Sequence, residues 1–129
     1  MAVVSPGGIL VGQTKEVKAS RSTVLLITDI SSSIAVATQN TLIPGVLEGR
    51  WQKQGRLLMR HIPRDEKVAS GDILLTTGVG GIFPKGLIAG QVYNVRQSDV
   101  ATEKEAEAYP LAQLNALEQV LVITNGTRR

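Results

Sequence analysis

The sequence predicts an all-β fold, a sandwich or small β-barrels of short antiparallel strands, with one short helix near residues 111–117. The 129 residues suffice for one ordinary domain or for two very small barrels that share a core. Hydrophobic residues make up 43% of the chain but aromatic residues only 3%, so the core has to be built from Val, Ile and Leu, a composition that favours strands. Short apolar runs recur about every ten residues with Gly or Pro between them, which is typical of β-sandwiches and barrels.

The first part of the chain reads as strands separated by turns. A short apolar run at 3–4 ends at a Ser-Pro-Gly-Gly turn. Segment 9–17 alternates roughly between apolar and polar residues, and Gly12 within it is expected to mark a bulge or a tight bend. A nearly continuous apolar strand is predicted at 23–28, and an alternating strand at 34–38.

The middle of the chain continues this pattern. Residues 44–49 form a short turn-strand-turn unit, and the polar, basic segment 51–56 is predicted to be the tip of a hairpin. Another strand is expected at 57–62. A long strand with period-two character is expected at 88–95, where Gly90 again marks a bend.

The C-terminal part contains the one ambiguous segment. Residues 101–108 have helical propensity, yet their glutamates fall at every second position, as in an edge strand. The short helix near 111–117 is predicted from leucines three residues apart, and a closing strand is expected at 120–123. The leucines are Leu111, Leu114 and Leu117.

The rest of the chain is expected to support the stretch 71–90. A Gly-Asp turn leads into an apolar strand, and a loop rich in glycine follows before the next strand begins. Glycines allow positive φ or a close backbone approach, and Pro84 pushes Phe83 toward an extended conformation. The sequence therefore predicts a rigid loop that presents Ile82 and Phe83 at a defined place.

Two interpretations of this loop remain open. In the first, Phe83 folds back and closes the mouth of a barrel. In the second, Ile82 and Phe83 are an apolar anchor for another protein, because aromatic anchors carry much of the energy of such contacts. We predict partner contact at Ile82 and Phe83, together with Trp51 and Tyr93.

The charge distribution is uneven although the net charge is only +3. Segment 50–67 is rich in Arg and Lys, whereas segment 99–118 is rich in Asp and Glu. Opposite patches on one chain suit self-association or a charged protein partner. The bland interpretation is that both are solvated faces that keep a sheet protein soluble.

Enzyme chemistry finds little support in the residues. His61 is the only histidine, and the serines lie in ordinary turn contexts without a nucleophile elbow. A degenerate hydrolase that uses His61 is nevertheless a competing hypothesis. With one histidine, no cysteine and scattered carboxylates, we expect no metal site and no cofactor. Segment 78–83 lacks the third glycine of a dinucleotide fingerprint and leads into a strand, so no nucleotide site is predicted.

A nucleic-acid-binding barrel is a second competing hypothesis. It would use the basic segment 50–67, but Trp51 is the one aromatic residue there for base stacking. The sequence has no apolar run of the ~20 residues that a membrane span needs and no N-terminal signal region. The chain is thus expected to be cytosolic or the excised soluble part of a larger protein.

The spacing of glycines and other turn residues in 71–90 resembles the signature of the rod shape-determining protein MreC, in its extracytoplasmic β-domain. Segments 8–13, 23–29 and 45–49 are similar to further parts of that family, as are Pro110 and 117–123, so the resemblance covers nearly the whole chain. Leu10 looks like an additional residue, and Thr77 stands where Ser is more usual. The positions matching the central motif are Gly71, Asp72, Thr77, Gly78, Gly80, Phe83, Pro84, Gly86 and Gly90.

The resemblance implies a domain organisation. Members of the family have a short cytoplasmic tail, a transmembrane helix, a coiled coil and two small β-barrels. Residues 1–129 would be the β-domain, with a partial first barrel and one complete barrel, and without the transmembrane or coiled-coil part. The expected location is periplasmic, with the membrane reached only through the missing N-terminal anchor.

The resemblance also implies a function. The family is a non-enzymatic scaffold of the bacterial cell-elongation machinery that maintains rod shape by organising peptidoglycan synthases. The expected partners are the peptidoglycan transpeptidase and other membrane proteins of the elongation complex, with no nucleic acid. The family implies no catalytic residues. A homo-oligomer or filament is expected as well, because an incomplete barrel leaves a sheet edge for intermolecular pairing.

Overall fold

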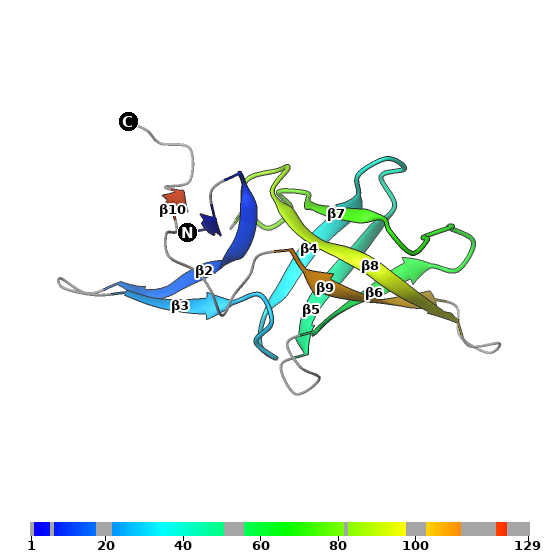
Figure 1. The fold of residues 1–129 in the computed structure, drawn as a ribbon, viewed down its shortest axis with the longest axis horizontal. Helices are drawn as coiled ribbons and strands as arrows, with labels where there is room; N and C mark the ends of the chain where they lie inside the picture. Colours follow the sequence, from blue (N-terminus) through cyan, green and yellow to red (C-terminus); the bar gives the residue numbers. More distant parts are fainter. Residues whose placement is uncertain are drawn as a thin grey trace.

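The computed structural model describes residues 2–5, 7–17, 22–50, 56–81, 83–97, 103–111 and 121–123 (Figure 1). Every regular element in these ranges is a β-strand, which confirms the all-β class. The predicted helix near 111–117 lies outside the described residues except for its first position. The strands are β1 (Ala2–Ser5), β2 (Ile9–Val17), β3 (Ser22–Leu26), β4 (Ser33–Thr38), β5 (Pro44–Arg50), β6 (Arg56–Pro63), β7 (Ile73–Thr76), β8 (Ile88–Gln97), β9 (Glu103–Pro110) and β10 (Leu121–Ile123).

Six of these strands close into a barrel in the order β4-β5-β6-β9-β8-β7 and back to β4. All six neighbouring pairs are antiparallel. The connection between β5 and β6 is the predicted hairpin, although its tip lies outside the described residues. Closure gives each strand of the barrel two hydrogen-bonded neighbours, so the barrel itself has no open edge.

Strand β9 corrects one of the predictions. The pattern of this segment predicts a helix or an edge strand, but β9 pairs with β6 on one side and with β8 on the other. Its alternation comes from the barrel wall, since Ala106 and Ala108 are fully buried while Glu103 is exposed. Small side chains point inward and charged ones point outward, which overrides the helical propensity of Glu and Ala.

The remaining described strands form an open antiparallel sheet beside the barrel, in the order β10-β1-β2-β3. It joins the barrel through a parallel contact of β2 with β8 at Ile9 and Ile88. Gly12 lies at a register shift between β1 and β2, and a Cβ there would collide with the carbonyl oxygen of Leu25. The predicted irregularity at Gly12 is therefore a close approach of two backbones. This sheet corresponds to the first barrel expected from the sequence. That it is a partial barrel stays a prediction.

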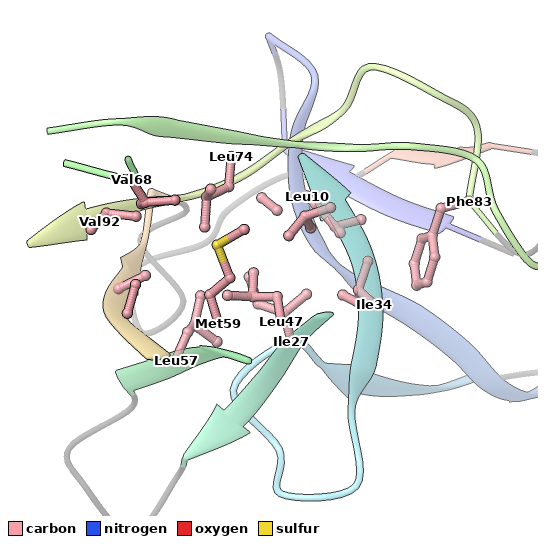
Figure 2. Close-up of a cluster of buried hydrophobic side chains, with 14 of the residues drawn as sticks. Leu10, Ile27, Ile34, Leu47, Leu57, Met59, Val68, Leu74, Phe83 and Val92 are labelled. Atoms are coloured by element: carbon pink, nitrogen blue, oxygen red, sulfur yellow. The ribbon is translucent and has the colours of Figure 1, made fainter. Parts of the chain in front are cut away.

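One aliphatic cluster fills the barrel and continues into the attached sheet. Figure 2 shows Met59 among Leu47, Leu57 and Leu74, all of which are nearly inaccessible to solvent. Ile27, which follows β3, belongs to the same cluster. The sheet and the barrel thus share one core, and burial of this apolar surface is the main force that holds them together.

Candidate partner-binding surface

The stretch 71–90 forms the corner of the barrel between β7 and β8. It begins at Gly71, whose φ of 98° needs a glycine, and the Asp72 carboxylate accepts the backbone N–H of Ala69 at 2.9 Å. Asp72 N–H donates to the Ala69 carbonyl, so the turn is closed twice. The Gly-Asp pair of the motif therefore sets the start of β7.

Thr76 ties together the two ends of the glycine-rich loop. Its buried hydroxyl donates to the Pro84 carbonyl at 2.6 Å and accepts the Leu87 N–H at 2.9 Å. Its carbonyl accepts the Gly86 N–H at 2.9 Å. Within the loop, Thr77 donates its hydroxyl to the Ala35 carbonyl of β4 at 3.4 Å. The loop is thereby fastened both to itself and to the barrel wall.

Glycine is required at most motif positions of this loop. Gly78, Gly80 and Gly86 have φ of 84°, 90° and 94°, as the sequence predicts. Gly90 is different, because its φ is ordinary but a Cβ would lie 2.9 Å from the Tyr109 carbonyl oxygen. The β7–β8 register also shifts beside it, in agreement with the predicted bend.

Phe83 is buried in this structure. It is 8% exposed and belongs to the large core cluster, where Figure 2 shows it on the Ile34 side. Of the two interpretations, this is the one in which the ring closes the barrel. A ring so enclosed offers little area to a partner. Partner contact at Phe83 stays a prediction, as does contact at Ile82 and Trp51, which lie outside the described residues.

Tyr93 lies on the outer wall of the barrel and is part of an ordered stack. Its ring packs against that of Tyr109 with centroids 5.7 Å apart and planes inclined by 28°. The Arg56 guanidinium carbon lies 4.9 Å from the Tyr93 centroid, which is cation–π geometry. Tyr93 donates to Glu107 at 3.0 Å, and Tyr109 donates to Gln91 at 3.1 Å. We call Arg56, Tyr93 and Tyr109 the aromatic column.

The basic and acidic segments of the sequence meet on this same wall. Arg60 pairs with Glu48 at 3.6 Å and with Glu105 at 3.3 Å. Arg96 pairs with Glu105 at 3.5 Å and with Glu107 at 3.7 Å. The expectation of two separate opposite patches is wrong for these residues, because β6 and β9 are neighbours and their charges pair within one molecule. Each exposed pair contributes at most about 1 kcal/mol to stability. The array therefore matters mainly for the pattern of charge that the wall presents to a partner.

His61 has no surroundings that favour catalysis. Its φ is 62°, at the register shift between β6 and β9, and its Nδ1 lies 3.2 Å from a carboxylate oxygen of Glu103. Both side chains are about half exposed. Within the described part of the chain, no serine hydroxyl is bonded to His61. The hydrolase hypothesis therefore gains no support from the geometry.

Nucleic-acid binding gains no support from the geometry either. Arg50 pairs with Glu48 at 3.0 Å, and Arg60 is also paired, so the basic segment does not form an uninterrupted cationic strip.

In the ranges that the structure describes, no group of three His, Cys, Asp or Glu residues could hold a metal ion. Those ranges also contain no helix long and apolar enough to cross a membrane.

Tyr109 and the role of Arg56 could not be found from the sequence pattern. The pattern of 101–108 does not decide between helix and strand, so it gives Tyr109 no position on a face. Identification of β9 as a strand of the β8–β9 hairpin would have provided the signal, because the register Gln91↔Tyr109 places Tyr109 next to Tyr93. Arg56 belongs to a basic segment, and its position over an aromatic ring depends on pairings that a linear pattern does not show.

Fold and surface together define a barrel-core domain, a closed β-barrel with an attached sheet and an ordered Tyr and Arg surface on its wall. The family model described as "Rod shape-determining protein MreC, barrel core" matches residues 1–124. The chain therefore belongs to the MreC family, and the resemblance found in the sequence is confirmed.

Individual relatives agree with this assignment. The cell shape-determining protein MreC of Geobacillus stearothermophilus is 33% identical over 132 residues, which cover 95% of this chain and 46% of the relative. The chain thus spans about half the length of this curated relative. The crystal structure of MreC from Pseudomonas aeruginosa superposes with a TM-score of 0.88 at 28% identity, covering 95% of this chain and 78% of that one.

Two more distant structures share the fold and are described by their context. One is a complex between the penicillin-binding protein PBP2 and MreC from Helicobacter pylori, with a TM-score of 0.74, 22% identity, and coverage of 92% of this chain and 73% of that one. The other is described as the major periplasmic domain from the cell shape-determining filament MreC, with a TM-score of 0.72, 22% identity, and coverage of 86% and 68%.

Proposed function

We propose that this chain is the barrel part of a non-enzymatic cell-envelope scaffold that maintains rod shape by holding peptidoglycan synthases in place. Its direct partner is a transpeptidase of the penicillin-binding protein class, alongside other membrane proteins of the elongation machinery. Membership in a cell shape-determining family supports this role, and so does the MreC relative that was solved in complex with PBP2. We place the domain in the periplasm, held at the membrane by the region that precedes it in the whole protein.

The aromatic column is the observation that carries this proposal. Tyr and Arg are among the residue types most enriched where protein contacts carry energy. Here they are stacked on one another, and the tyrosine hydroxyls are held by neighbouring side chains, so little side-chain freedom is lost when a partner docks. Tyr109 is 38% exposed and is therefore available for contact.

Replacement of Tyr109 by Ser is expected to weaken binding to the cognate transpeptidase by about tenfold, because it removes an exposed ring and frees the Tyr93 ring beside it. The dissociation constant should be measured by biolayer interferometry with the purified partner ectodomain. Leu42→Ser is the control, since Leu42 is also an exposed apolar residue, at 73%, but lies in the turn between β4 and β5. Equal affinities of wild type and Tyr109→Ser would remove the column from the binding surface.

We propose further that copies of this chain associate through the open sheet. Among the described strands, β3 is hydrogen-bonded only to β2, and an unpaired edge is a template for another chain. Val24 on this strand is partly exposed, so an apolar contact accompanies the edge. The relative described as a filament supports this second role.

A charge on the β3 edge is expected to prevent this association. Val24→Lys adds a cation where strands of two copies would approach, which is how natural edge strands avoid pairing. In sedimentation velocity, wild type should gain mass with concentration, and Val24→Lys should sediment as a monomer. Ile30→Lys serves as the control, because Ile30 is 61% exposed but lies in the turn after β3. If both variants associate at the same protein concentration as wild type, the β3 edge is not the site of association.

A further inference from the structure

A small recess lies beside the aromatic column on the outer wall of the barrel. Its volume is about 30 Å³, enough for one small polar group and too small for an aromatic ring. The lining residues come from β5, β6, β8 and β9, so the closed barrel fixes their spacing. They are Arg50, Arg56, Leu57, Leu58, Arg96 and Glu107.

The floor of the recess is apolar. Leu57 and Met59 belong to the cluster that fills the barrel, whereas Leu58 between them does not. Because successive side chains of a strand point to opposite faces, Leu58 lies on the outer face. It is nonetheless only 7% exposed, so the surrounding side chains cover it. A leucine kept on the outside of a barrel but largely covered makes a suitable floor for the stem of an inserted side chain.

The rim of the recess is charged. Three arginines and one carboxylate, that of Glu107, lie there. Glu107 is already engaged by the Tyr93 hydroxyl and the Asn94 amide, both at 3.0 Å, and by Arg96 at 3.7 Å. Arg50 is paired with Glu48. Arg56 forms no ion pair with another described residue and lies over the Tyr93 ring, so its guanidinium is the cation with donors to spare.

We propose that this recess receives an acidic side chain of the partner protein, with its carboxylate on Arg56 and its methylene stem on Leu58. The inference rests on the proposed scaffold function and adds the chemistry of the contact. Arginine presents a planar fork of donors that matches a carboxylate, and stacking on Tyr93 holds that fork in place.

A protein carboxylate is favoured over an anionic polymer or lipid. The recess admits one small group, and the adjoining surface is aromatic, as in protein–protein contacts. The neighbouring cations Arg60 and Arg96 are neutralised by glutamates, whereas a polyanion would need a continuous row of free cations.

The test measures binding of Arg56 variants to the purified cognate transpeptidase ectodomain. Arg56→Gln is expected to weaken binding about tenfold and to flatten its dependence on salt between about 50 and 300 mM NaCl. The affinity of Arg56→Lys, which keeps the charge but loses the planar fork of donors, should lie between those of wild type and Arg56→Gln. Lys67→Glu is the control, because Lys67 is an exposed cation of the same basic segment outside the recess. Circular dichroism melts confirm that each variant is folded.

The outcomes separate this inference from the function on which it rests. If wild type binds and Arg56→Gln binds equally well, the recess is not the receptor and the scaffold function stands. If wild type does not bind, both are overturned. Vesicles with about 30% phosphatidylglycerol provide the third arm. Loss of vesicle binding in Arg56→Gln with unchanged transpeptidase binding would replace the carboxylate by a lipid anion and overturn the proposal.

Discussion

Replacing Phe83 by Ala is expected to lower the free energy of unfolding by about 3 kcal/mol, because it leaves a cavity where the ring now fills the core. The ring is 8% exposed and packs in the same cluster as Ile34. It lies on a loop that Thr76 fastens at both ends, so the loop cannot simply collapse into the space. Chemical denaturation followed by circular dichroism measures the change.

Phe83→Leu is the control for this prediction. It keeps most of the apolar volume and should cost less than about 1.5 kcal/mol. Phe83→Asp separates the structural role from a binding role. If Phe83 acts as an exposed anchor, this variant abolishes transpeptidase binding and keeps a wild-type melting curve. The buried ring predicts instead that Phe83→Asp lowers the melting temperature, and that any loss of binding is a consequence of this lower stability.

Replacing Gly49 by Ala is expected to destabilise the fold by about 3 kcal/mol, for a reason that is steric. Gly49 of β5 passes directly against the turn after β3, and an added Cβ would lie 2.5 Å from the Thr28 carbonyl carbon and 2.6 Å from that of Asp29. Both contacts are with backbone, which can move only if the turn separates from the barrel. The free energy of unfolding in urea gives the cost.

Gly45→Ala is the matched control on the same strand. A Cβ at Gly45 would meet chiefly the flexible end of the Met59 side chain, 2.5 Å away, which can change rotamer. We therefore expect a smaller loss for Gly45→Ala than for Gly49→Ala. Equal losses would mean that crowding against Met59 is as costly as the backbone collision, and the steric argument for Gly49 would fail.

Local signals in the sequence were sufficient where structure depends on near neighbours. The Gly-Asp turn, the apolar run and the glycines of 71–90 predict β7, the corner and β8, because positive φ and turn chemistry are properties of a few adjacent residues. The family motif lies in this stretch for the same reason. Gly12 and Gly90 also mark irregular sites, as predicted. At both sites a second backbone passes close to the glycine.

Features that depend on pairing were beyond these signals. The helical propensity of Ala and Glu in β9 was overridden by its place between β6 and β8. The same pairing brings Glu105 to Arg60, so two patches that are separate in the sequence become one array of ion pairs. Tyr109 joins Tyr93 only through the β8–β9 register, and the recess beside them requires four strands at once.

The order in which the barrel is assembled follows from its strand neighbours. Four of its six junctions link consecutive strands, β4–β5, β5–β6, β7–β8 and β8–β9, and so close short loops. The other two, β4–β7 and β6–β9, join strands that are far apart in the chain and carry a larger entropic cost of closure. We therefore expect the local hairpins to form early and these two seams to seal last. Until they do, β4 and β7 expose free edges, and a nascent chain is most prone to aggregation at that stage.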